Sequence, residues 1–166
     1  MPRVLIAYGT RHGSTRDVAE AVAETLRSEG LDADVRAAAE VDDLSGHAAV
    51  VVGGGVYGGK WHPDALAFLE RHREALRVIP VACFALGMSF VRQDDDAERQ
   101  RSAVSDQIRR NVAPVDIACF AGSALGYPFI MRVLTRLMRA PQGDHRDWDA
   151  IAAWARRIAP ALSAAS

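Results

Sequence analysis

Val4-Leu5-Ile6-Ala7-Tyr8-Gly9-Thr10-Arg11-His12-Gly13-Ser14-Thr15 is the stretch that decides the fold of this chain. Its first five residues form a continuous apolar run, which is typical of a strand buried on both faces of a sheet. A turn rich in glycine and hydroxyl groups follows, and a helical pattern begins at Arg16. The unpaired N–H groups and the dipole at the start of such a helix favour an anion. The stretch therefore predicts a phosphate site.

The turn carries side chains that suit a terminal phosphate monoester. It offers three hydroxyl groups, a glycine that permits a tight turn, and two side chains that add positive charge. The residues predicted to bind the phosphate are Thr10, Arg11, His12, Gly13, Ser14 and Thr15. The alternative is an ordinary capped helix without a ligand, in which Ser14 is the N-cap and Asp17 lies at the third helical position.

Apolar runs and helical patterns alternate along the rest of the chain. Further strands are predicted at 32–36, 49–52, 81–86 and 117–121, and helices at 16–28, 62–76, 94–110 and 148–159. This alternation predicts an α/β fold with a doubly wound parallel sheet, whose ligands bind beyond the carboxyl ends of the strands. We expect the tail after Pro160 to be frayed.

The composition is that of an ordinary globular protein. The chain has 166 residues, of which 49% are apolar and 25% charged, and this predicts one domain over 1–166. A net charge of −1 gives no basic field for nucleic acid. Cys83 and Cys119 lie inside apolar runs, which is typical of core thiols in a reducing compartment, and they lack metal-ligand spacing. The sequence contains no signal peptide and no apolar run long enough to span a membrane, so we expect a cytoplasmic protein. The lack of metal-ligand spacing leads us to expect no metal site.

A glycine-rich stretch, residues 53–60, satisfies two nucleotide-binding spacings without their context. Three of its glycines have the G-x-G-x-x-G spacing, but they follow an inner strand and no clear acidic partner follows them. Residues 54–60 also have the G-x-x-x-x-G-K spacing, but Trp61 stands where a Ser or Thr would bind Mg²⁺. We therefore expect a loop in which the missing Cβ atoms let a flat ligand approach the backbone.

Two loops that follow buried strands would meet the phosphate turn at one edge of the sheet. We expect Tyr57 to stack on a planar ring, whereas for Trp61 stacking is about as favoured as a core or surface role. The loop from Leu86 would offer backbone groups to the polar edge of the ring. The residues predicted to hold the ring are Gly54, Gly55, Val56, Tyr57, Gly58, Trp61, Leu86, Gly87, Met88 and Ser89.

These loops together resemble the flavodoxin-like family, which binds FMN. The usual phosphate loop of that family is Ser/Thr-x-Thr-Gly-x-Thr, and residues 10–15 match it with His12 in place of the central hydroxyl. The resemblance implies a three-layer sandwich with a five-stranded parallel sheet in the order 2-1-3-4-5. It also implies that FMN is the cofactor and that the loops starting at Gly54 and Leu86 flank its isoalloxazine ring.

A narrower resemblance covers nearly the whole chain. The chain is similar to menaquinone-dependent protoporphyrinogen oxidases and their flavodoxin-domain relatives, which carry an aromatic-His pair like Trp61-His62 and a Gly-Ala-Leu-x-Tyr-Pro motif like residues 123–128. Asp147-Trp148 matches the Asp-Trp that opens their final helix, although the stretch 141–148 is short beside theirs. The resemblance implies an oxidoreductase of haem biosynthesis that passes electrons from protoporphyrinogen IX to a quinone. It adds Tyr127 to the cofactor-binding residues.

An additional segment at about 127–141 contains a basic amphipathic helix, Phe129 to Arg139. Its three arginines fall together on a helical wheel, apolar side chains fall opposite them, and no acid interrupts the run. Such a helix can lie on an anionic membrane surface or dock a partner. Alternatively, its apolar side packs on the rest of the chain and the arginines remain in water.

The near-neutral net charge bears on electron transfer. Typical electron-carrying flavodoxins are strongly acidic, which disfavours the anionic reduced flavin and lowers its potential. This chain has arginines at Arg11, Arg92 and Arg132 and lacks that acidic field. We infer a less reducing flavin that is better suited to accepting electrons.

No Ser-His-Asp set or pair of carboxylates indicates a catalytic mechanism of its own. His62 is a weak candidate for a proton donor near the ring, and a helix-start histidine that faces solvent is the more frequent role. Three functions remain open: a quinone-linked FMN enzyme, an electron carrier that uses the same site, and a flavin-free interaction module.

Overall fold

A parallel sheet forms the centre of the protein, in a computed structural model that describes residues 1–164. The strands are β1 (Arg3–Gly9), β2 (Asp32–Ala37), β3 (Ala49–Tyr57), β4 (Lys60–Trp61), β5 (Val81–Gly87) and β6 (Asp116–Ala121). The parallel strands lie in the order β2-β1-β3-β5-β6, and β4 pairs antiparallel with the end of β3. The predicted five-stranded order is therefore confirmed, and the short β4 was not predicted.

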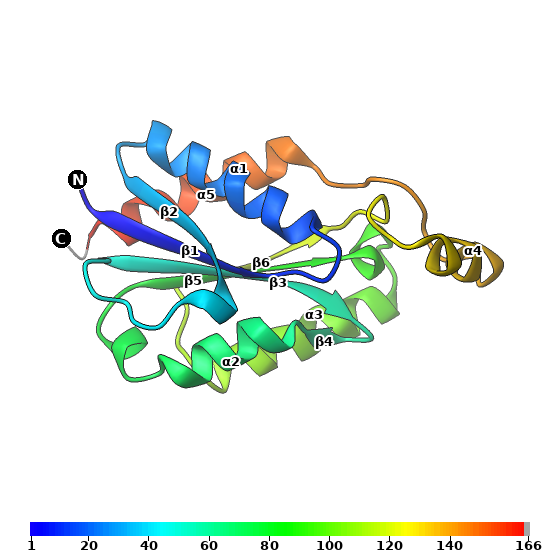
Figure 1. Ribbon diagram of the computed structural model, residues 1–166, viewed down its shortest axis with the longest axis horizontal. Coiled ribbons are helices and arrows are strands. Elements are labelled where there is room, and N and C mark those ends of the chain that lie inside the picture. The colour runs from blue at the N-terminus through cyan, green and yellow to red at the C-terminus, as the bar shows by residue number, and fades with distance from the viewer. Residues whose placement is uncertain (165–166) are drawn as a thin grey trace.

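Four helices cover the two faces of the sheet. They are α1 (Ser14–Ser28), α2 (Pro63–Arg71), α3 (Asp95–Arg109) and α5 (Trp148–Ser163). Helices α1 and α5 pack on one face and α2 and α3 on the other (Figure 1). In β1, Val4 and Ile6 join the first core and Leu5 and Ala7 the second, as the alternation of a strand requires. The protein thus has the predicted three-layer α/β architecture.

The last helix continues beyond the point where we expected a frayed tail. Helix α5 contains Pro160 and runs to Ser163. Leu162 is fully buried in the core that α5 shares with α1. Burial of that side chain stabilises the final turn, although a proline inside a helix removes one backbone hydrogen bond. Residues 165–166 of the predicted tail lie outside the described part of the chain.

The glycine-rich stretch is mostly strand rather than the predicted loop. Strand β3 continues through three glycines to Tyr57, and the turn is confined to Gly58 and Gly59, whose φ angles are 59° and 76°. A Cβ atom on Gly53 would clash with the ring of Phe84, and one on Gly54 would lie 2.7 Å from Trp61 Nε1. These glycines therefore make room for neighbouring aromatic side chains, which a propensity-based strand boundary at residue 52 does not detect.

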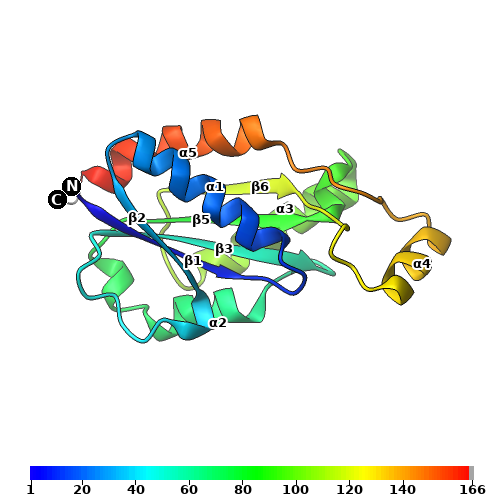
Figure 2. The ribbon, with the colours of Figure 1, turned by 45° about the horizontal axis from the view of Figure 1, so that its top comes forward.

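Helix α4 (Phe129–Leu137) does not join either core. It projects beyond the carboxyl end of the sheet, away from the other helices (Figures 1 and 2). None of its side chains is buried, and Phe129 and Leu137 are 75% and 77% exposed. The expectation that its apolar side packs on the rest of the chain is therefore wrong. Within residues 1–164, no helix is long and apolar enough to cross a membrane.

Candidate functional site

The first loop ends in a helix start that no side chain caps. Gly13 is the N-cap of α1, with φ 89°, and its N–H donates to Thr10 Oγ1 at 3.0 Å. Ser14 is the first helical residue, so the N-cap position that the capped-helix alternative assigns to it is wrong. Among the described residues, no side chain accepts a hydrogen bond from the first turn of α1. These N–H groups are available to an anion.

Two adjoining cavities open at the carboxyl edge of the sheet. The narrower, of about 10 Å³, is lined by Ser14, Val56, Tyr57, Leu86, Gly87, Met88, Gly122, Ser123 and Tyr127. The wider, of about 660 Å³, is lined by His12, Gly13, Ser14, Arg16, Asp17, Glu20, Ser123, Leu125, Gly126 and Arg146. They share Ser14 and Ser123. The structure thus brings together residues from all the loops that we predicted to meet here.

Aromatic rings gather over the first loop. The imidazole of His12 lies 4.9 Å from the ring of Tyr127 and 6.2 Å from that of Tyr57, measured between ring centres. The guanidinium of Arg11 lies 4.8 Å from the centre of the Tyr57 ring. Burial raises the pKa values of Tyr57 and Tyr127, so both phenols stay protonated and can donate hydrogen bonds at neutral pH.

Trp61 is not available for stacking. Its indole is 1% exposed, and its Nε1 donates to the carbonyl of Phe84 at 3.2 Å. This indole lies against Gly54 and occupies the space in which the sequence predicts a flat ligand. Of the two roles weighed for Trp61, the core position is correct. The stacking prediction is wrong because the β4 turn directs the side chain into the core.

His62 serves as the N-cap of α2 instead of facing solvent. Its Nδ1 accepts a hydrogen bond from the N–H of Asp64 at 3.1 Å, and its side chain is 11% exposed. Burial lowers the pKa of His62, although the Asp64 carboxylate opposes this shift. A Cβ on Gly9 would lie 2.7 Å from the same Nδ1, so His62 packs against the end of β1. It lines neither cavity, and the structure does not support it as a proton donor there.

The remaining predicted residues have mixed positions. Thr10 and Thr15 lie in the first loop and the first turn of α1, and Thr15 is 1% exposed. Gly55 lies below the folded-back Tyr57 ring, whose Cε2 would be 3.2 Å from a Cβ on that glycine. Gly58 forms the turn after β3, and Ser89 lies in the short helical turn after β5. Neither Gly58 nor Ser89 lines the two cavities.

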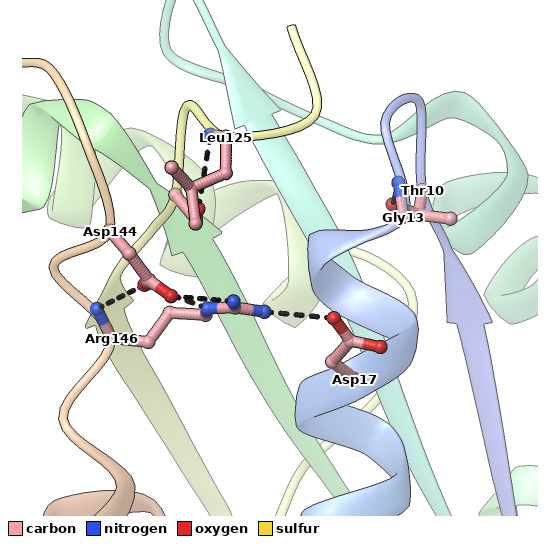
Figure 3. A network of polar contacts seen from close by, with 7 residues as sticks. Thr10, Gly13, Asp17, Leu125, Asp144 and Arg146 are labelled. Atoms are coloured by element: carbon pink, nitrogen blue, oxygen red, sulfur yellow. Dashed lines mark hydrogen bonds and ion pairs between the residues drawn. The ribbon is translucent and has the colours of Figure 1, made fainter.

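Sequence patterns did not identify Arg146, which closes one side of the wider cavity. Its Nη1 lies 3.1 Å from Asp17 Oδ2, and its Nη2 lies 2.7 Å from Asp144 Oδ2 (Figure 3). Its side chain is 10% exposed. The contact joins the first turn of α1 to the segment before α5, two regions 129 positions apart. Ser123 and Gly126 were also missed, although both lie in the motif at residues 123–128 from which only Tyr127 was predicted to bind the cofactor.

Comparisons with known proteins agree with this arrangement. A family model described as a flavodoxin domain matches residues 5–149. The chain is 26% identical to protoporphyrinogen IX dehydrogenase [quinone] of Escherichia coli (strain K12), over 95% of this chain and 94% of that one. Among solved structures, a mutant flavodoxin from Pseudomonas aeruginosa is 18% identical, with a TM-score of 0.60 and coverage of 97% and 99%. Oxidised flavodoxin 1 from Bacillus cereus is 12% identical, with a TM-score of 0.62 and coverage of 95% and 97%. At these identities the solved structures establish the fold alone.

Proposed function

Because the chain belongs to the flavodoxin domain family, we propose that it is an FMN-dependent oxidoreductase that oxidises protoporphyrinogen IX and passes the electrons to a quinone. FMN is the cofactor of this family. The observation that carries the proposal is the uncapped start of α1 beside two half-buried tyrosines at one edge of the sheet. We also propose that the chain works as one domain, because α5 shares a core with α1.

The residues at this edge fit FMN. The N–H groups of the first turn of α1 suit its phosphate, and the hydroxyl groups of Thr10 and Ser14 lie beside them. Tyr57 and Tyr127 suit its ring, with Val56 and Leu86 as an apolar wall that excludes water. The narrow cavity, at about 10 Å³, is smaller than a flavin ring, so binding of the ring requires side chains that line it to move. The proposed cofactor-binding residues are Thr10, Arg11, His12, Gly13, Ser14, Val56, Tyr57, Leu86, Gly87, Met88, Ser123 and Tyr127.

FMN, when bound, supplies the redox step, and the chain supplies position and electrostatics. Within the described residues, no histidine or carboxylate lines the narrow cavity. The chain instead offers hydroxyl donors from Tyr57, Tyr127 and Ser14 and backbone groups from Gly87. These groups orient a polar ring edge but provide no general base. The proposed reaction therefore depends on the flavin and the acceptor rather than on a catalytic side chain.

The quinone acceptor is supported by the relative from Escherichia coli, whose name states a quinone, and by the absence of a strong acidic charge.

An electron carrier that uses the same site is the second candidate, because the structural neighbours are flavodoxins. Family membership weighs against a flavin-free module. Rapid anaerobic reoxidation of the reduced protein by menadione, coupled to protoporphyrinogen oxidation, supports the enzyme. Slow reoxidation by menadione with fast transfer to a redox protein supports the carrier.

The exposed helix α4 supports a site of action at a membrane surface. Its apolar side chains face solvent, Arg132 and Arg136 line one hollow on its surface, and Arg139 follows its last turn. Arg92 adds a fourth positive charge, because its Nη2 donates to the carbonyl of Arg139 at 3.1 Å. No acidic residue occurs between Ile117 and Gly143. We propose that α4 lies on the anionic cytoplasmic face of a membrane, where a quinone is within reach.

Vesicle binding tests this part of the proposal. We expect the protein to sediment with phosphatidylglycerol vesicles but not with phosphatidylcholine vesicles. The double variant Arg132→Gln, Arg136→Gln should lose about 1 kcal/mol of binding free energy per arginine. The matched control is Arg109→Gln, Arg110→Gln, which removes two exposed arginines at the other end of the sheet. Equal loss in the two double variants, or equal binding to both lipids, would exclude α4 as the membrane contact.

A further inference from the structure

His12 carries a buried nitrogen that no other group in the structure uses. Within residues 1–164, its Nε2 is buried and has no hydrogen-bond partner. A buried imidazole nitrogen without a partner is costly, and such groups are usually paired. His12 also stands where the family's phosphate loop has a hydroxyl, so this side chain distinguishes the chain from that pattern.

The surroundings hold the His12 ring beside the helix start. It lines the wider cavity together with Gly13 and Ser14, which form the turn into α1. Tyr127 packs on its ring, and a Cβ on Gly126 would clash with the carbonyl oxygen of His12. The segment after β6 therefore fits tightly over the first loop. The imidazole is held at the edge of the anion site instead of extending into solvent.

The charged and hydroxyl groups around His12 are compatible with a bound anion. Arg11 precedes it, and the phenols of Tyr57 and Tyr127 approach it from β3 and from the segment before α4. Arg16, Asp17, Glu20 and Arg146 line the same cavity, and Asp17 is already paired with Arg146. No carboxylate forms a hydrogen bond with His12 in the described part of the chain. A phosphate monoester would supply the missing acceptor.

We propose that His12 recognises the phosphate monoester of the cofactor through Nε2 and takes up a proton from solvent when the phosphate binds. The inference rests on the proposed FMN site. Protonation gives His12 a charge and an additional donor, and charge-assisted hydrogen bonds to phosphate are the stronger ones. A threonine at this position would give a contact that does not depend on the protonation of the protein.

In the protein without a bound phosphate, His12 is able to take up a proton because its imidazole is neutral. Burial, and secondarily the Arg11 charge, lower the pKa of His12, so the imidazole is neutral at pH 7. A bound phosphate raises that pKa, and linkage then requires phosphate affinity to rise as the pH falls. The gain is lost as the pH rises through the raised pKa of the bound state. Riboflavin, which lacks the phosphate, should bind without this dependence.

Proton NMR of the His12 imidazole tests the inference directly on the full chain after its flavin has been removed. We expect inorganic phosphate and FMN to raise the pKa of His12 and riboflavin to leave it unchanged. If FMN binds and the pKa of His12 does not move, the inference is overturned and the proposed function stands. If phosphate raises the pKa but no flavin binds, the contact between His12 and phosphate stands, whereas the proposed function and the assignment of that phosphate to FMN both fail.

A matched variant gives a second readout. His12→Thr restores the hydroxyl of the family pattern, so it should still bind FMN. FMN itself gains a second negative charge near pH 6, and that effect is common to both proteins. Relative to His12→Thr, the wild-type affinity for FMN should therefore fall by about tenfold more between pH 5.5 and pH 8. Parallel pH profiles for the two proteins would overturn the inference.

Discussion

Arg146 binds Asp17 across 129 positions of sequence, with Nη1 and Oδ2 3.1 Å apart. The same guanidinium also holds Asp144, whose pKa is lowered by the hydrogen bond from Arg146. Asp17 lies in the first turn of α1, and Asp144 lies in the segment that leads to α5 (Figure 3). The two contacts therefore fix that segment against the helix whose N-terminus is the proposed phosphate site.

Arg146→Ala should destabilise the protein by about 1 to 2 kcal/mol, because it removes a mostly buried guanidinium and leaves two carboxylates without their partner. Urea denaturation measures the change. The control is Arg99→Ala, which breaks an exposed pair with Asp96 and should cost less than about 0.5 kcal/mol. Equal losses in the two variants would show that the Arg146 contacts do not stabilise the fold.

Substitutions of Trp61 and of Tyr57 should have different effects, because the first should lower the stability of the fold and the second the affinity for flavin. Trp61→Phe removes the hydrogen bond to Phe84 and part of a buried side chain, so it should cost about 1 to 3 kcal/mol of stability without weakening flavin binding. Tyr57→Leu should weaken FMN and riboflavin equally, by about 0.5 to 1.5 kcal/mol. Fluorescence titration and thermal unfolding measure both effects. Loss of flavin affinity in Trp61→Phe would contradict the core assignment.

Asp116 should make stability depend on pH in the acid range. Burial raises the pKa of Asp116. The hydrogen bonds from Arg157, Trp154 and the N–H of Ile117 together lower that pKa by more than burial raises it, so the net shift is downward. A depressed carboxyl pKa contributes stability above its ordinary value of about 3.9, and that contribution is lost as pH falls through the folded-state pKa. Asp116→Asn should therefore be less stable than wild type at pH 7, with a smaller difference below pH 4. A difference that is constant from pH 7 to pH 3 would contradict this assignment.

The bound flavin should have a less negative potential than that of a strongly acidic flavodoxin. The chain has a net charge of −1, and the Arg11 guanidinium lies beside the Tyr57 ring. Positive charge near the flavin ring stabilises the anionic reduced form of the flavin. Arg11→Glu should lower the potential in a potentiometric titration, whereas Arg156→Glu, an equal charge change on an exposed residue of α5, should lower it less. A wild-type potential as low as that of a typical flavodoxin would contradict the charge argument.

Local sequence patterns predict much of the fold, because the apolar runs at 4–8, 49–52 and 81–86 each specify a buried strand. The run at 117–121 also forms a strand, but β6 lies at the edge of the sheet and is only half-buried, so the prediction that it is buried on both faces is wrong. Local patterns also misjudged the glycines of β3, whose role depends on Phe84 and Trp61 lying against them. The same limitation applies to Trp61, which local sequence equally allows at a surface or in a core. Arg146 could not be found at all, because its partner Asp17 is distant in sequence. The prediction of an anion site in the first loop needs only local sequence, because it depends on a glycine- and hydroxyl-rich turn that opens a helix.

The measurement that tests the central claim most directly is a paired titration of the flavin-free protein with FMN and with riboflavin. The account predicts one FMN per chain, bound about a hundredfold or more tightly than riboflavin, because the phosphate meets the free N–H groups at the start of α1. Equal affinities would mean that the phosphate does not bind there. Absence of binding by either flavin would contradict the proposed site itself.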